Sequence, residues 1–284
     1  MRSIAKLMKD WQFTGPNGVT TAVELPHTWN ARDGQDGGND YWRGCCTYCT
    51  RFAAPVYDPA QQQVWLQFEG VNASAAVLLN GQQLCTHDGG YSTFRAEVTE
   101  LLQAENQLTV RVDNSVNDRV YPQKADFTFY GGIYRDVSLL VVNKNHIALG
   151  HFGDTGVKIT PTLKEGSTDI QVETLVEGSG TVTVELLDAE GRTVAKGEGE
   201  NTFLHLDAPH LWNGIKDPYL YTCVVRLLQD GKPVDEVTTK VGLRSFSVDP
   251  KKGFFLNGRP YPFTVCPAIR PQGSGQRHHP GDAR

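Results

Sequence analysis

Two stretches of the sequence combine aromatic, glycine and polar residues densely enough to bind a ligand. The first is residues 25–30, which run into residues 40–44, and the second is residues 126–136. Aromatic ring faces pack on the apolar C–H patches of sugars, while neighbouring carboxylates accept hydrogen bonds from hydroxyl groups. The alternative is a packed, hydrogen-bonded core layer. It would be formed by Trp29, Trp42, Tyr134 and Arg135. Residue types alone favour this structural interpretation.

Catalytic signatures are weak when the residues are taken by themselves. The sequence has no glycine-rich nucleotide loop after a strand, no Gly-x-Ser-x-Gly elbow and no His-Glu-x-x-His pair. Its 32 acidic residues place carboxylates close together in sequence by chance. Glycoside hydrolysis needs two carboxyl groups about 5 Å apart for retention, or further apart for inversion. Spacing along β-strands cannot establish such a pair.

The six cysteines are too few and too scattered for a disulfide scaffold in 284 residues. Cys45, Cys46 and Cys49 form a cluster that resembles part of a metal site. On an extended strand, however, Cys45 and Cys46 point to opposite faces, and no second Cys/His pair follows at a zinc-like spacing. We therefore predict reduced strand cysteines and no metal site. His278 and His279 lie in a tail without regular structure and are not assigned as ligands.

The elements that would position these residues are β-strands almost throughout. Apolar and polar residues alternate over residues 64–68, 108–112, 181–185 and 221–226, the period of a half-buried strand. Turn signals separate such segments: Asn80-Gly81, Asp230-Gly231 and Asn257-Gly258 each favour a tight hairpin. Helical periodicity is confined to one short turn within residues 96–102. The sequence predicts an all-β protein.

Two domains are expected from the change in pattern near Val142. Residues 1–142 contain most of the tryptophan and the long loops, and they are predicted to form a jelly-roll β-sandwich. Residues 143–245 show about seven evenly spaced strands, which is typical of an immunoglobulin-like β-sandwich. Residues 246–262 are expected to begin a further link, and residues 263–284 to be a disordered tail rich in Pro, Gly and basic residues.

Composition excludes several classes of protein. A formal net charge of -5 argues against a nucleic-acid partner, because proteins that follow phosphates are usually basic. No apolar run reaches the roughly 18–20 residues that cross a bilayer, so no membrane association is expected. The first ten residues lack the apolar core of a secretion signal. The expected location is therefore the cytoplasm.

Several motifs together resemble the N-terminal sugar-binding and immunoglobulin-like domains of glycoside hydrolase family 2, β-galactosidase type. In the first domain they are residues 25–30, 36–44, 68–81, 87–94, 105–114 and 131–137. Val241-Gly-Leu-Arg244 and residues 255–262 resemble the family's link from the immunoglobulin-like domain into a catalytic (TIM) barrel. The resemblance covers residues 1–262 in order.

The resemblance implies a retaining hydrolase of terminal β-galactosides, with one Glu as acid/base and another as nucleophile, both in the barrel. No catalytic residue can therefore be assigned in this chain. Asp126 occupies the place of an Asp that binds substrate hydroxyl groups in some members; the alternative is an exposed loop carboxylate. No cofactor is assigned to this chain, although relatives use Mg²⁺ and Na⁺. For the parent, a β-galactoside substrate is expected and a homo-oligomer is left open.

The resemblance stops at Pro262. Back-translation of residues 263–270 and 275–284 in shifted frames gives family-like sequence, so we expect small indels to have ended this reading frame early. The prediction is thus the truncated N-terminal part of a β-galactosidase, without its barrel and inactive alone. The alternatives are a stand-alone carbohydrate-binding protein and a purely structural pair of β-sandwiches.

Overall fold

The computed structural model describes residues 1–31, 42–121, 129–150 and 152–262. These residues form two compact units. One unit contains Ala5–Pro55 and Leu66–Leu139, and the other contains Met1–Ile4, Val56–Trp65 and the residues from Leu140. Strands β1 (Ser3–Lys6), β5 (Gln62–Phe68) and β12 (Val137–Asn143) each contribute residues to both units. The predicted domain boundary after Val142 stays a prediction.

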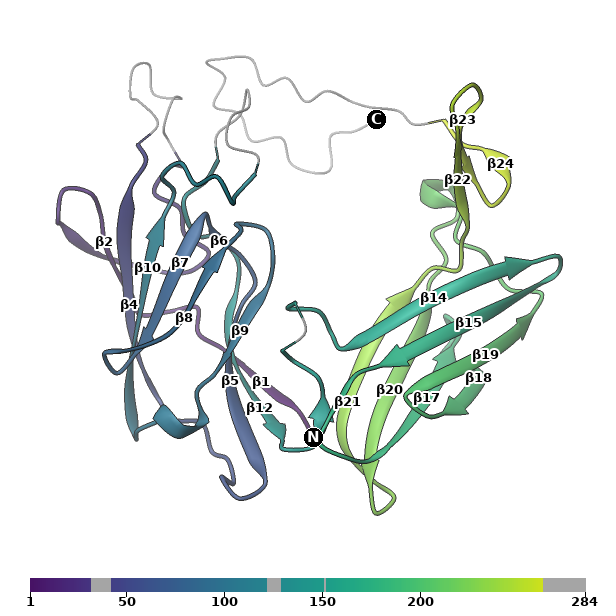
Figure 1. Ribbon diagram of the computed structural model, residues 1–284, viewed down its shortest axis with the longest axis horizontal. Helices are drawn as coiled ribbons and strands as arrows, with labels where there is room; N and C mark the ends of the chain where they lie inside the picture. The colour runs from purple at the N-terminus through teal and green to yellow at the C-terminus, as the bar shows by residue number, and fades with distance from the viewer. Residues whose placement is uncertain (32–41, 122–128, 151, 263–284) are drawn as a thin grey trace. The chain divides into compact units, whose positions relative to one another are not determined.

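The first sandwich, as we call it, is built from a six-stranded and a four-stranded sheet (Figure 1). The order in the larger sheet is β3-β2-β4-β10-β7-β8, and in the smaller sheet β1-β12-β5-β9. A short pair, β11-β6, adds to them. The strands are β1 (Ser3–Lys6), β2 (Trp11–Thr14), β3 (Thr20–Val23), β4 (Cys45–Ala53), β5 (Gln62–Phe68), β6 (Val71–Asn72), β7 (Ser74–Leu79), β8 (Gln82–Asp88), β9 (Phe94–Glu97), β10 (Glu105–Asp113), β11 (Gly132–Ile133) and β12 (Val137–Asn143).

Alternation of side chains explains why these segments pair as they do. In the centre of the larger sheet Val110 of β10 lies opposite Tyr48 of β4 on one side and Val77 of β7 on the other. All three side chains are fully buried. A one-residue slip would turn every such side chain to the outer face, so burial fixes the register. The strands predicted over residues 64–68 and 108–112 are confirmed.

The second sandwich, as we call it, packs a three-stranded sheet, β14-β15-β19, with a four-stranded sheet, β18-β17-β20-β21 (Figure 1). The two sheets together have seven strands, and about seven were predicted for residues 143–245. The elements are β13 (His146–Ile147), which pairs with β16 (Val176–Glu177), β14 (Val157–Lys164), β15 (Ser167–Thr174), β17 (Thr181–Leu187), β18 (Thr193–Glu198), β19 (Asn201–Asp207), β20 (Tyr221–Gln229) and β21 (Lys232–Val241).

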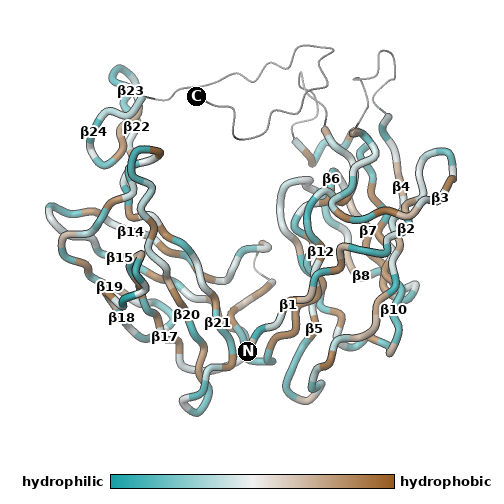
Figure 2. The backbone as a smooth tube through the Cα atoms, turned by 180° about the vertical axis from the view of Figure 1, so that it is seen from behind, coloured by the Kyte–Doolittle hydropathy of each residue, from teal (hydrophilic) through white to brown (hydrophobic). Residues whose placement is uncertain are grey.

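The core of the second sandwich consists of aliphatic side chains from both sheets. Ile170 and Val172 of β15 are fully buried, as are Val184 and Leu186 of β17. Figure 2 shows the matching alternation of hydrophobic and hydrophilic residues along these strands. Beyond the sandwich, β22 (Phe246–Asp249), β23 (Gly253–Leu256) and β24 (Arg259–Pro260) form a separate small sheet.

The three turns predicted at Asn80-Gly81, Asp230-Gly231 and Asn257-Gly258 all connect hairpins. They join β7 to β8, β20 to β21 and β23 to β24. Asn80 and Gly81 have φ values of 52° and 84°, so both central residues are in the left-handed region that the tight hairpin turn requires. The chemistry of these dipeptides therefore sets where the strands reverse.

The described residues contain only two helical turns, both 3-10. They are η1 (Thr99–Leu101), inside the short helical turn predicted for residues 96–102, and η2 (Gly214–Lys216). No helix in this part of the chain has the length and apolar character to cross a membrane.

An exposed ionic cluster covers part of β15 and β19. His205 Nδ1 lies 2.6 Å from Asp169 Oδ1, its Nε2 lies 3.2 Å from Asp207 Oδ1, and Lys164 pairs with Asp169. The hydrogen bond to Asp169 raises the pKa of His205 above its ordinary value of 6.5, and the bond to Asp207 adds to the shift. Asp169 in turn has a lowered pKa, chiefly through Lys164.

We expect NMR titration of the His205 ring to give a pKa above 6.5, because both carboxylates stabilise the imidazolium. A raised folded-state pKa means that this stabilisation is complete at pH below 6.5 and disappears as pH rises through the folded-state value. Asp169→Asn should lower the pKa of His205. A wild-type value at or below 6.5 would show that the cluster does not form in solution.

Candidate functional site

Two buried asparagines organise one end of the first sandwich. Asn30 and Asn114 are 0% and 3% exposed. The Nδ2 group of Asn114 donates to Asn30 Oδ1 at 3.3 Å, and Asn30 Nδ2 donates to the Trp42 carbonyl at 3.1 Å. Asn114 Oδ1 accepts from the backbone N–H of Gly44 at 2.8 Å, and Asn30 Oδ1 accepts from that of Gly131, also at 2.8 Å.

This arrangement, the loop-root network, joins the roots of two long connections. Asn30 precedes and Gly44 follows one connection, while Asn114 begins and Gly131 ends the other. Gly131 must be a glycine, because an added Cβ would lie 2.7 Å from Asn114 Nδ2 and closer still to the Trp29 ring. The network therefore sets where both connections leave the sheets.

The large side chains of the two sequence clusters form two pairs in the structure. Trp29 and Trp42 meet edge to face with ring centroids 6.0 Å apart. The guanidinium carbon of Arg135 lies 5.4 Å from the centre of the Tyr134 ring, and Arg135 also donates to the Tyr91 carbonyl at 3.2 Å. The four side chains thus pair two by two, but none of them is fully buried and Arg135 is exposed, so they do not form the single core layer that the structural interpretation predicted.

A histidine and a tyrosine beneath the network are also structural. His27 Nδ1 lies 2.7 Å from the hydroxyl group of Tyr48, which is fully buried. Burial lowers the pKa of His27 and raises the pKa of Tyr48, so both are neutral at pH 7. We assign them to packing and not to proton transfer.

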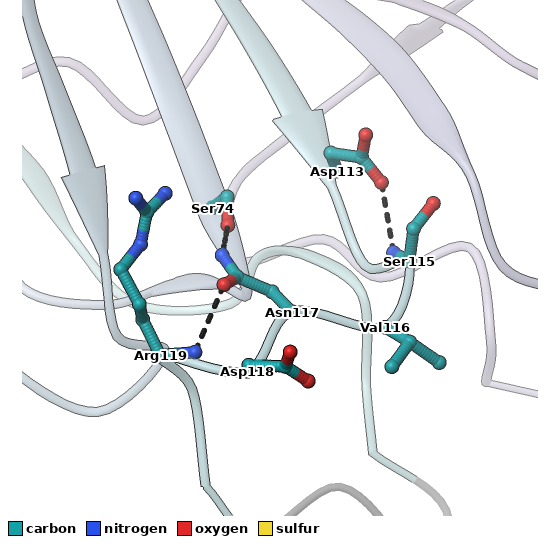
Figure 3. Close-up of a pocket in the computed structure, with 7 residues that line it drawn as sticks. All are labelled: Ser74, Asp113, Ser115, Val116, Asn117, Asp118 and Arg119. Atoms are coloured by element: carbon teal, nitrogen blue, oxygen red, sulfur yellow. Dashed lines mark hydrogen bonds between the residues drawn. The ribbon is translucent and has the colours of Figure 1, made fainter.

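Beside the network is an open pocket of about 630 Å³ (Figure 3). Ser74 at the start of β7 and Asp113 at the end of β10 contribute from strands, and the remaining lining residues follow β10 in the chain. These are Ser115, Val116, Asn117, Asp118 and Arg119. Since Asn114 precedes this loop directly, the loop-root network fixes the position at which the pocket loop begins.

Asp88 of β8 bonds three of the polar side chains of the pocket, those of Ser74, Asn117 and Arg119. Its Oδ1 accepts from the Ser74 hydroxyl at 2.7 Å and from Asn117 Nδ2 at 2.9 Å. Its Oδ2 pairs with Arg119 Nη2 at 2.7 Å. The Ser74 hydrogen bond is the main cause of a lowered Asp88 pKa, and Arg119 and Asn117 lower it further. Asp88 is therefore ionised at neutral pH and restricts the rotamers of its partners.

Asp126, the substrate-binding residue predicted from the sequence, lies outside the described residues, and its role stays a prediction. Asn30 belonged to a predicted cluster, but its role as a structural bridge was not foreseen. Ser74, Asn117 and Arg119 were missed. One signal was present: a run of Asn, Asp and Ser follows a strongly alternating strand, a composition typical of a polar loop.

The cysteine cluster has the alternation that the sequence predicted. Cys45 is exposed and Cys46 is buried, and burial raises the pKa of the Cys46 thiol to about 12. Within the described ranges, no three His, Cys, Asp or Glu side chains converge into a group that could hold a metal ion.

Comparison with protein-family models gives two matches that overlap over residues 151–162. Residues 38–162 match the galactose-binding-like domain of glycosyl hydrolase 2, and residues 151–244 match glycosyl hydrolases family 2. The two matches follow each other in the order of the two sandwiches.

Individual relatives agree with this assignment. A β-glucuronidase of Bacteroides fragilis is 34% identical over 97% of this chain, and a β-galactosidase of Bacteroides ovatus is 32% identical over 88%. An FMN-binding β-glucuronidase structure from Faecalibacterium prausnitzii covers 92% of the chain at 36% identity, with a TM-score of 0.87.

The matched relatives are longer than this chain. It spans 43% of the B. fragilis β-glucuronidase, 32% of the B. ovatus β-galactosidase and 42% of the F. prausnitzii structure. With both domain matches in the order of the sandwiches, the chain carries two domains of glycosyl hydrolase family 2 and belongs to that family.

Proposed function

We propose that this chain is the non-catalytic N-terminal region of a family 2 β-glycosidase. In this role the loop end of the first sandwich forms part of the wall around the substrate, and the second sandwich connects it to the catalytic part. The chain by itself is expected to hydrolyse no glycoside.

The observation that carries this proposal is the match to a β-glucuronidase along 97% of the chain but only 43% of that relative. The described polar site supports it, because buried amides and a polar pocket suit positioning and binding better than bond cleavage. Retaining hydrolysis needs an acid/base and a nucleophilic carboxyl group about 5 Å apart. We place both in the part of the parent enzyme that lies beyond this chain.

We propose β-glucuronides as the substrate class of the parent enzyme. Among the named relatives, a β-glucuronidase combines the higher identity with the larger coverage of this chain. Terminal β-galactosides are the second candidate, supported by the 32% identity to the B. ovatus β-galactosidase and by the motifs at residues 25–30 and 36–44. For either substrate, Asp126 is proposed to bind sugar hydroxyl groups. Mg²⁺ and Na⁺ are assigned to no described residue.

A domain graft tests the proposed role. Residues 1–262 would replace the matching region of the B. fragilis β-glucuronidase, and kcat/KM would be measured on 4-nitrophenyl β-D-glucuronide. We expect an active enzyme, whereas the same host without any N-terminal region should be inactive. A folded graft with no activity above the host deletion would refute the proposal. The 284-residue chain alone serves as the negative control.

A further inference from the structure

We propose that the pocket formed by Ser74, Asp113 and residues 115–119 binds a neutral pyranose. The pocket's volume of about 630 Å³ lies within the roughly 300–1,000 Å³ of small-molecule sites. The choice of a saccharide as ligand rests on the proposed function, whereas the arrangement of the groups does not.

The first argument is that part of the site is already ordered. Ser74, Asn117 and Arg119 are each bonded to Asp88, and Asn117 Nδ2 also donates to the Ser74 hydroxyl at 2.9 Å. Figure 3 shows Asn117 bridging Ser74 and the backbone N–H of Arg119. A ligand therefore meets groups whose side-chain entropy is already reduced, which favours binding.

The second argument is the match between groups and ligand. The carboxylates of Asp113 and Asp118 accept hydrogen bonds from hydroxyl groups, and the Arg119 guanidinium carries several donors. Val116, which is 69% exposed, offers an apolar contact for the C–H face of a sugar ring. The combination of polar groups with a small apolar surface suits a carbohydrate better than a wholly apolar ligand.

The third argument is charge, which selects among sugars. Asp113 and Asp118 line the pocket, and the charge of the lining residue Arg119 is offset by its ion pair with Asp88, so these groups together leave two net negative charges. A uronate carboxylate is repelled by this site, whereas a neutral hexose is not. If the parent enzyme cleaves β-glucuronides, the pocket binds a neutral sugar residue in another part of the substrate and does not bind the glucuronate residue.

The test is an NMR titration of the full 284-residue chain with methyl β-D-galactopyranoside, methyl β-D-glucopyranoside and methyl β-D-glucuronide. We expect saturable shifts of the backbone amides of residues 115–119 with at least one neutral glycoside, at millimolar dissociation constants. The uronate should bind about fivefold more weakly. This is the ratio produced by the repulsion between its carboxylate and one carboxylate of the pocket across ~4 Å of water. Asn117→Ala should weaken binding of the neutral sugar about fivefold through one lost hydrogen bond.

Two charge variants make the test specific. Asp118→Asn preserves size and removes one charge, so the difference between neutral and uronate sugars should shrink. Glu105→Gln, at the opposite end of β10, should leave both affinities unchanged. Any of three results overturns the proposal. They are no shift of these amides with any neutral glycoside at tens of millimolar, an equal affinity for the uronate and the neutral glycosides, or the same shifts with Ca²⁺ in the absence of sugar, which would assign the carboxylates to a cation. An active domain graft together with any of these results would reject the pocket and retain the proposed function.

Discussion

Arg2→Met should lower the unfolding free energy of the second sandwich by about 3–5 kcal/mol, because it leaves a buried carboxylate without its cation. Asp235 is 0% exposed, and Arg2 binds it in a bidentate way, with Nη2–Oδ2 at 2.7 Å and Nε–Oδ1 at 3.1 Å. Arg2 Nη2 also donates to the Ile147 carbonyl at 3.0 Å. Urea denaturation followed by tryptophan fluorescence measures the loss.

Two controls separate the buried charge from a general effect at the N-terminus. Lys6→Met removes the cation of the exposed pair with Asp136, and it should leave the urea midpoint almost unchanged. Combining Arg2→Met with Asp235→Asn should restore much of the stability, because Asn retains an acceptor for the Ile147 N–H without a charge. If Arg2→Met were as mild as Lys6→Met, the buried pair would not be formed in solution.

Asn114→Ala should cost about 2–3 kcal/mol of first-sandwich stability, since it removes the acceptor of the Gly44 N–H and both donated bonds of the amide. The effect should extend to binding, because the pocket loop begins at this residue. We expect the neutral-sugar shifts of residues 115–119 to disappear in this variant. Thermal unfolding and the same NMR titration measure the two effects.

Asn117→Ala, three residues further along, is the matched control. Asn117 is half-buried in the pocket loop, so its loss should weaken sugar binding while changing stability much less than Asn114→Ala. Equal destabilisation by the two variants would contradict the loop-root network as the main support of this end of the sandwich.

Local signals in the sequence predicted much of the fold. The Asn80-Gly81 turn, for example, combines two residues that tolerate positive φ, and it lies between alternating strands in the sequence and in the structure. The opposite faces of Cys45 and Cys46 follow from the period of two along a strand. In both cases the structure depends on residues that are adjacent in sequence, so the sequence alone is enough to predict it.

The candidate site was harder to predict because its contacts span long distances in sequence. Asn114 bonds a residue 84 positions away, and Asn117 bonds Ser74 across 43 positions. Arg2 and Asp235 are separated by 233 positions. Nothing in the local pattern around these residues distinguishes a network amide from an ordinary loop asparagine. Their roles become evident only when the strand order is known.

The most direct test of the central claim compares the domain graft in two hosts. Residues 1–262 would replace the matching regions of the B. fragilis β-glucuronidase and the B. ovatus β-galactosidase, and each graft would be assayed on its host's substrate. We predict that both grafts are active and that the β-glucuronidase graft retains the larger fraction of its host's kcat/KM. Greater retention in the β-galactosidase host would favour β-galactosides as substrates, and two folded but inactive grafts would contradict the assignment of this chain as a glycosidase region.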